Sequence, residues 1–197
     1  MLDEKRISEI KKRVERFLEE GIIKKEKEKR FVEFFLKNSK DSLDSAKLLF
    51  DVSTKNNFKN YLGFPDFNGF LWVVNSSYYS MFYMARALLE YEGIKIKTDQ
   101  SIHAIVFDAL VYYFYLTGRL EKKLIEDFAE AEKEALEVLG KEKAKELIED
   151  YFYEKEKRAL FNYEMGAIAM KNKAQTSLER VKKFDEEIRK IIENKRW

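Results

Sequence analysis

The sequence predicts an all-α protein, an up-and-down bundle of helices that forms a single domain over residues 1–197. Apolar residues recur every three or four positions along most of the chain, which is the spacing of an amphipathic helix. Seven glycines and one proline fall between these stretches and mark their ends. No stretch alternates apolar and polar residues for long, so no long β-strand is expected. A chain of 197 residues is long enough to form one core without a metal or disulfide bonds.

The seven helices predicted in this way cover about residues 3–20, 27–55, 66–92, 100–116, 119–139, 141–163 and 167–194. Ile10 and Val14 lie on the apolar stripe of the first helix, which must therefore dock on the rest of the protein. The second helix is long enough to span the domain, and Ser39 and Ser42 allow a neighbouring helix to approach it closely. A polar loop at about 54–66 follows and is too short to separate domains.

The third predicted helix is the most apolar, and its apolar residues nearly encircle it. Such a helix is buried on most sides. Asp66 is its expected N-cap, and Gly93 is its expected C-terminal stop. The remaining four helices each have one apolar and one polar face. They are separated by Gly118, Gly140 and Gly166.

The composition excludes several classes of site. The chain has no cysteine, which excludes disulfides, zinc–thiolate centres, iron–sulfur clusters and thiol nucleophiles. Its single histidine, His103, excludes a multi-histidine metal site within one chain, and we expect neither a metal nor a cofactor. The sequence shows no uncharged apolar run that could span a membrane and no secretory signal, so a cytoplasmic protein without membrane contact is expected. Charged residues make up 38% of the chain in near balance, which is typical of a thermophile-like surface.

Few residues stand out as carriers of chemistry. The sequence has no Walker loop, GxGxxG, GxSxG or HExxH motif, so no standard nucleotide or hydrolase site is predicted. As a general base, His103 would need a partner that fixes its tautomer, and a structural or surface role is the favoured interpretation. Tyr78, Tyr79 and Tyr83 occur where a core would use leucine. They are expected in a polar seam or a dimer contact, with a base-stacking surface as the alternative.

A longer pattern runs through the middle of the chain. The tyrosine pair Tyr78 and Tyr79 precedes a Met-Phe and Ala-rich helix, Gly93 and a Lys-Thr turn, in the stretch NSSYYSMFYMARALLEYEGIKIKTDQSIHAIVFDAL. An apolar helix follows, and Arg158 later stands five residues before Tyr163 in RALFNY. In order and spacing these features resemble HEPN domains, small helical domains named after higher eukaryotes and prokaryotes nucleotide-binding.

The resemblance covers about residues 38–193, and its last part is an amphipathic, basic helix at 174–193. It implies a four- or five-helix bundle to which the helix at 3–20 is appended. It also implies a homodimer that is encoded beside a minimal nucleotidyltransferase as a toxin–antitoxin pair, with RNA or nucleotide as the ligand. The acidic segment at 119–150 is longer than in compact members of the family, and we interpret it as an inserted helical hairpin that contacts a partner.

Many members of this family are metal-independent ribonucleases with an Arg-x4-6-His motif, in which histidine acts on the 2′-hydroxyl or the leaving oxygen and arginine holds the phosphate. Here no histidine follows Arg158, and Tyr163 stands where the histidine would be. Tyrosine, with a usual pKa of about 10, is a poor general base. We therefore expect a binding or regulatory module rather than an enzyme. The residues expected to hold its ligand are Arg158, Asn162, Tyr163 and Tyr79.

Two alternatives remain open from the sequence. The first is an active ribonuclease in which Arg158 works with Tyr163, and with His103 brought in by folding. The second is a purely structural dimer, in which Arg158, Asn162 and Tyr163 merely close a helix before Gly166.

Overall fold

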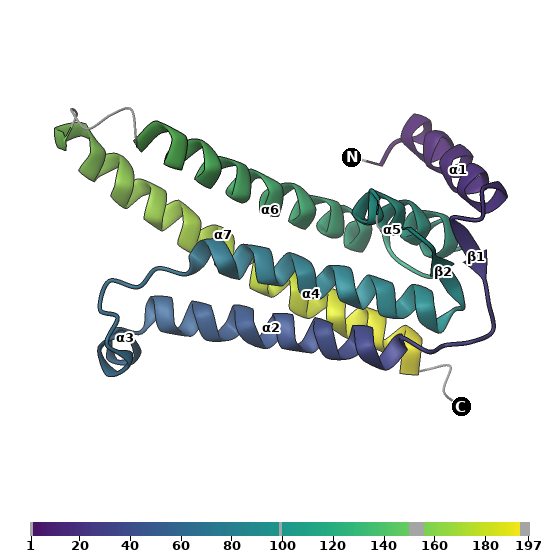
Figure 1. Ribbon diagram of the computed structural model, residues 1–197, viewed down its shortest axis with the longest axis horizontal. Coiled ribbons are helices and arrows are strands. Elements are labelled where there is room, and N and C mark those ends of the chain that lie inside the picture. Colours follow the sequence, from purple (N-terminus) through teal and green to yellow (C-terminus); the bar gives the residue numbers. More distant parts are fainter. Residues whose placement is uncertain (1, 99, 150–155, 194–197) are drawn as a thin grey trace.

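The computed structural model of the protein confirms the predicted all-α bundle (Figure 1). The structure describes the backbone of residues 2–98, 100–149 and 156–193, and their side chains except those of residues 139 and 141–167. The helices are α1 (Glu4–Glu19), α2 (Val32–Thr54), α3 (Asn56–Leu62), α4 (Phe70–Tyr91), α5 (Ile102–Leu110), α6 (Lys122–Glu149) and α7 (Glu156–Glu193). A π-helical segment, η1 (Val111–Tyr115), continues α5, and the strands β1 (Ile23–Lys25) and β2 (Ile94–Ile96) pair in antiparallel orientation.

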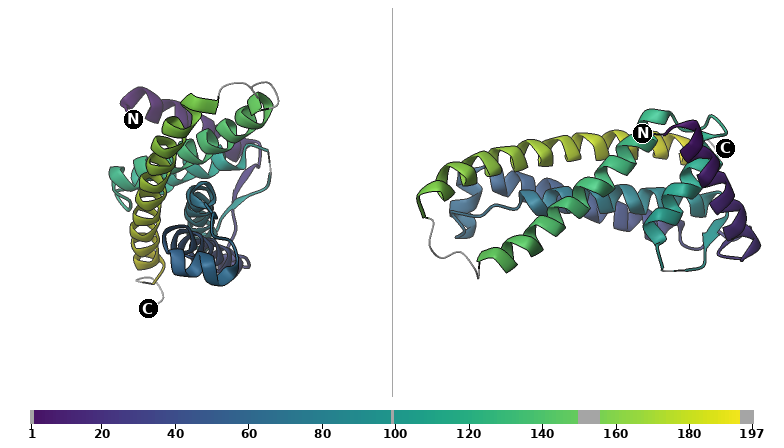
Figure 2. Two further views of the ribbon diagram at one scale, coloured as in Figure 1. Left: turned by 90° about the vertical axis from the view of Figure 1, so that its left-hand side faces the viewer. Right: turned by 90° about the horizontal axis from the view of Figure 1, so that it is seen from above.

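Helix α4 is the centre of the bundle. It packs against α2, α6 and α7, and Figure 1 shows α2 and α4 side by side with α7 behind them. Along the chain, α2, α4, α6 and α7 run alternately in opposite directions, which is the predicted up-and-down order. Helix α1 lies at the end of the bundle where α5, η1 and the strand pair gather, and both views of Figure 2 show it outside the long helices.

The core forms where α4, α5, α6 and α7 meet. Met81 and Leu88 of α4 are fully buried, in agreement with the prediction that this helix is enclosed on most sides. The ring of Phe128 on α6 stacks on Phe184 of α7, with 5.6 Å between ring centres, and on Phe107 of α5 at 6.4 Å. Because each ring belongs to a different helix, this stack ties α5, α6 and α7 together.

The helix boundaries predicted at Gly140 and Gly166 are wrong. Both glycines lie inside helices, so the helix predicted at 141–163 does not exist as a separate element. Its first part belongs to α6 and its last part to α7. One glycine inside a helix costs only about 1 kcal/mol relative to alanine. The Lys, Glu, Ala and Leu residues around each glycine favour the helix enough to continue it.

Three local features also differ from the prediction. Helix α4 begins at Phe70 rather than after Asp66, which is therefore not its N-cap. Helix α3 occupies the loop predicted at 54–66. The strand pair was not predicted, because strands of three residues are too short to show an alternating pattern.

Gly93 ends α4 as predicted. Its φ angle is +73°, in the left-handed region that favours glycine. The backbone of Glu26 lies directly against it, and a Cβ atom on residue 93 would overlap the Glu26 carbonyl oxygen. The Glu26 N–H in turn donates to the Gly93 carbonyl at 2.8 Å. The turn after α4 thus brings the segment that follows β1 beside β2.

Candidate functional site

His103 lies in the first turn of α5 and faces α4. The Tyr78 hydroxyl lies 2.5 Å from its Nδ1 atom. The imidazole ring also packs against Phe82, with 4.3 Å between ring centres, and against the edge of Tyr79 at 6.0 Å. The hydrogen bond and the ring contacts hold the imidazole in one orientation.

The electrostatics of this pair favour its neutral form. Burial, and then the nearby Arg86 cation, lower the pKa of His103 below its usual 6.5. Burial, and then the charge of Glu132, raise the pKa of Tyr78, so its hydroxyl keeps its proton at neutral pH. Among the residues that the structure describes, Nδ1 is the one acceptor within hydrogen-bond distance of the Tyr78 hydroxyl, and donation to it fits a neutral imidazole. The neutral imidazole then carries its proton on Nε2.

This tautomer limits what His103 can do. Its Nδ1 lone pair accepts from Tyr78, and its Nε2 atom is a hydrogen-bond donor. A general base needs a free lone pair that faces the proton it removes. In this arrangement His103 has none, so it can donate to a ligand but cannot take a proton from one without losing the Tyr78 bond.

One side of α4 carries exposed rings, together with a half-buried tyrosine and a half-buried arginine, beside His103. We call it the α4 aromatic face, and it consists of Trp72, Tyr79, Tyr83 and Arg86. Their spacing of seven, four and three positions puts them on one stripe of the helix. The Tyr79 side chain is 41% exposed and Trp72 is 53% exposed.

Helix α2 borders this stripe. The Arg86 guanidinium lies 4.5 Å from the ring centre of Phe35, which also stacks on Tyr83 with 6.5 Å between ring centres. Contacts between α2 and α4 thus hold both Arg86 and Tyr83 in place. Two of the site residues predicted from the sequence, His103 and Tyr79, are in contact in the structure.

Arg158, Asn162 and Tyr163 have a different position. Their backbone lies in the first two turns of α7, and their side chains lie outside the described residues. Figure 1 shows the start of α7 and the start of α5 at opposite ends of the bundle, so one chain does not bring Arg158 beside His103. The helix also continues through Gly166, so these residues do not close it.

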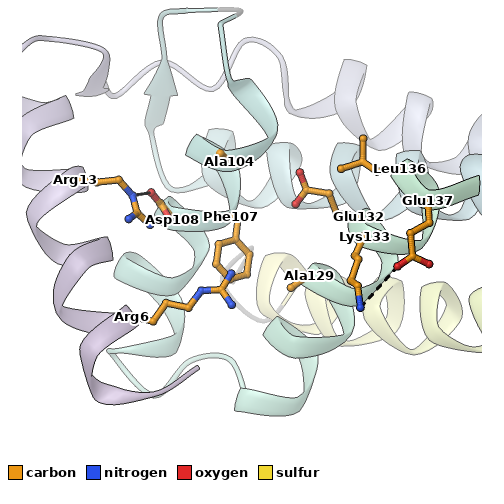
Figure 3. Close-up of a pocket in the computed structure, with 10 residues that line it drawn as sticks. All are labelled: Arg6, Arg13, Ala104, Phe107, Asp108, Ala129, Glu132, Lys133, Leu136 and Glu137. Carbon is orange, nitrogen blue, oxygen red and sulfur yellow. Dashed lines mark hydrogen bonds and ion pairs between the residues drawn. The ribbon is translucent and has the colours of Figure 1, made fainter. Parts of the chain in front are cut away.

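A second set of polar residues, which was not predicted from the sequence, lines a cleft between α1, α5 and α6 (Figure 3). Arg13 of α1 forms two hydrogen bonds with the buried Asp108 of α5, Nε to Oδ2 at 2.7 Å and Nη2 to Oδ1 at 2.9 Å. Glu132 of α6 and Arg6 of α1 also face the cleft. No local motif signals this set, because its members come from three helices that are far apart in the sequence.

Comparison with family models, with curated proteins and with solved structures finds no match for this chain. Within the described residues, no group of three or more His, Asp or Glu side chains is placed to hold a metal ion. No described helix is both long and apolar enough to cross a membrane.

Proposed function

We propose that the protein is a HEPN-like binding module that works as a homodimer, with RNA or a nucleotide as its ligand and a minimal nucleotidyltransferase as its protein partner. The observation that carries the proposal is the α4 aromatic face, where the exposed Tyr79 lies beside His103 and on the same stripe as Arg86. The family, the homodimer and the nucleotidyltransferase come from the resemblance of residues 38–193 to HEPN domains.

The chemistry of the α4 aromatic face suits a nucleic acid. Exposed aromatic rings stack on bases without regard to sequence, at about 1–3 kcal/mol per base. An arginine next to such rings binds a phosphate through its planar fork of donors. Tyr79 and Trp72 supply exposed rings, Arg86 supplies the cation, and His103 supplies an Nε2 donor at the edge. The ligand would lie along α4.

A role in binding rather than in catalysis is supported by the state of His103. Its Nδ1 lone pair accepts from Tyr78, and burial and Arg86 lower its pKa. The start of α7, which carries Arg158 and Tyr163, is at the other end of the same chain. A cleavage site would need a base and a phosphate-holding cation on the same bond of the RNA.

Exposed apolar side chains on α2 support a protein partner. Phe31, Phe34 and Leu48 are 48%, 56% and 63% exposed. Phe34 and Leu48 are separated by about four helical turns and so lie on one side of α2. Contiguous exposed apolar groups mark interaction surfaces in soluble proteins, and Phe31 and Phe34 lie one turn apart at the start of α2. A second copy of the chain and the nucleotidyltransferase are the occupants we propose.

One observation favours a second function, a metal-independent ribonuclease. Arg86 is close enough to His103 to lower its pKa, so an arginine and a histidine do meet in space although no Arg-x4-6-His motif exists. Such a pair could hold a phosphate and move a proton if ligand binding released His103 from Tyr78. The same site would then cleave the RNA that it binds.

The test uses labelled mixed RNA in EDTA and follows both retention and cleavage. We expect the full chain to retain RNA without cleaving it, and we expect Tyr79→Ala and Arg86→Gln to weaken retention by about tenfold. Tyr61→Ala is the matched control, because Tyr61 is an 89% exposed tyrosine on α3, away from the site. RNA cleavage that is lost in His103→Asn would instead establish a ribonuclease that uses His103. RNA cleavage that is lost in Arg158→Ala would show that Arg158 takes part in the cleavage. Equal retention by all variants would contradict a site on the α4 aromatic face.

A further inference from the structure

The cleft between α1, α5 and α6 is a second candidate binding site, separate from the α4 aromatic face (Figure 3). Its volume is about 540 Å³, within the range of about 300–1,000 Å³ that is usual for small-molecule sites. Apolar side chains form much of its wall: Ala104, Phe107, Ala129 and Leu136. A ligand of moderate size could bury an apolar or planar body against them.

Two ion pairs in the cleft are already formed. Arg13 holds Asp108 through two hydrogen bonds, and Asp108 is almost fully buried. Lys133 lies 3.8 Å from Glu137, the contact drawn as a dashed line in Figure 3. Glu137 also accepts from Lys173 at 3.4 Å. Asp108 and Glu137 thus already have cationic partners, which leaves Glu132 as the carboxylate of the cleft without an ion pair among the described residues.

Glu132 and Arg6 both line the cleft, and their charges are opposite. Neither forms an ion pair with any residue that the structure describes. The Arg6 guanidinium lies 5.3 Å from the ring centre of Phe107, and the Glu132 carboxylate reaches into the cleft from the opposite wall. Burial raises the pKa of Glu132, and the opposing effect of Arg6 is smaller. The carboxylate thus loses part of its hydration without gaining an ion pair among the described residues.

The two groups select complementary chemistry in a ligand. A half-buried carboxylate is best satisfied by two parallel N–H donors on one planar edge. A guanidine-type edge suits this position better than an ammonium group, because it is more weakly hydrated. Arg6 can in turn donate to a phosphate or a carboxylate. Glu132 and Arg6 would therefore bind opposite ends of one molecule.

We propose that this cleft binds a small molecule with a guanidine-type donor edge, which pairs with Glu132, and an anionic group, which pairs with Arg6. Two sources share this chemistry. A guanine nucleotide presents the N1–H and N2–H donors of its base and a phosphate, and free arginine presents its guanidinium and its carboxylate. The proposal does not rest on the proposed function, because Arg6 lies in α1, outside residues 38–193 that resemble HEPN domains.

The experiment is a calorimetric titration of the full-length Tyr79→Ala variant with GMP and with L-arginine, because the α4 aromatic face is itself proposed to bind nucleotides and Tyr79→Ala weakens it. AMP and L-lysine are the matched probes, because each keeps the anionic group and lacks the guanidine-type edge. We expect GMP or arginine to bind, and AMP and lysine to bind about tenfold more weakly or not at all. Binding of GMP alone or of arginine alone supports the proposal and identifies the source.

Variants of the chain locate the site. Glu132→Gln and Arg6→Gln should each weaken binding by about tenfold or more. Glu130→Gln is the control, since Glu130 is exposed on the same helix and does not line the cleft. The proposal is overturned if neither probe binds at millimolar concentration, if AMP and lysine bind equally well, or if Glu132→Gln and Arg6→Gln retain full affinity.

Discussion

Glu132 shows how a single side chain can be kept in an unfavourable state by the fold. Its carboxylate is half-buried, burial raises its pKa above the usual 4.5, and no cation within ion-pair distance offsets that effect among the described residues. Binding sites often contain such groups, which find a partner only when the ligand binds. In the free protein, a group of this kind reduces the stability. The cost of Glu132 should therefore be measurable without any ligand.

We expect Glu132→Gln to increase the free energy of unfolding at about pH 7. The folded protein holds the Glu132 proton more tightly than the unfolded chain, so wild-type stability falls as the pH rises from about 4.5 through the folded pKa. The gain from Glu132→Gln should therefore be largest at neutral pH and shrink at about pH 4. Urea unfolding at the two pH values measures this difference, with Glu130→Gln as the exposed control. A gain that is larger at acid pH would contradict the assignment.

His103 should titrate below the usual pKa of 6.5, because burial and Arg86 disfavour the imidazolium. The unfolded chain then binds the proton more tightly, so the contribution of His103 to stability is complete above pH 6.5 and is lost as the pH falls toward the folded pKa. An NMR titration of the imidazole ring measures it directly, since the chain has one histidine. Arg86→Gln should move the pKa up. A wild-type pKa at or above 6.5 would mean that the ring is exposed and not held by Tyr78.

At the scale of the elements, glycines have two different roles in this bundle. Gly140 lies in α6 with open space where a Cβ atom would be, and its φ angle is not positive. Gly93 has a positive φ angle and the Glu26 backbone against it. The sequence alone does not distinguish them, since both follow long helical stretches.

Gly140→Ala should therefore stabilise the protein by about 0.5–1 kcal/mol, because alanine restricts the unfolded chain and favours α6. Gly93→Ala should destabilise it, since the new methyl group meets the Glu26 carbonyl and the φ angle is unfavourable for alanine. Thermal unfolding should show a higher melting temperature for Gly140→Ala and a lower one for Gly93→Ala than for the wild-type chain. If Gly140→Ala lowered the melting temperature, α6 would not be continuous through residue 140.

At the scale of the whole molecule, the long helices leave apolar groups uncovered on α2, and a homodimer would cover them. Sedimentation velocity of the full chain should show a dimer that dissociates on dilution, and Phe34→Glu with Leu48→Glu should shift it to monomer by placing charges in the interface. Ile168→Glu on α7 is the matched control, because Ile168 is also 56% exposed. A chain that remains monomeric at high concentration, or an equal effect of Ile168→Glu, would contradict dimerisation through α2.

Local spacing was sufficient to predict most of the architecture. The apolar stripe of the first predicted helix, 3–20, corresponds closely to α1, and the nearly encircled helix at 66–92 is the buried α4. The glycines at positions 140 and 166 do not end helices, since strong helix formers on either side continue a helix through them.

The sites could be predicted only in part. Tyr79 and His103 are recognisable from their residue types. Arg6, Asp108 and Glu132 are charged residues with no distinguishing pattern in the sequence, and they come together only because α1 docks on α5 and α6. The contact between Tyr78 and His103 joins residues 25 positions apart.

The sequence by itself determined the all-α class, the central position of α4 and the exclusion of thiol and multi-histidine chemistry, because periodicity and composition are local properties of a chain. Only the tertiary structure decided the contact between His103 and Tyr78, the exposure of the α4 aromatic face and the position of Glu132 and Arg6 in one cleft. Burial, hydrogen bonding and charge proximity depend on distances between helices, and those distances exist only once the helices pack.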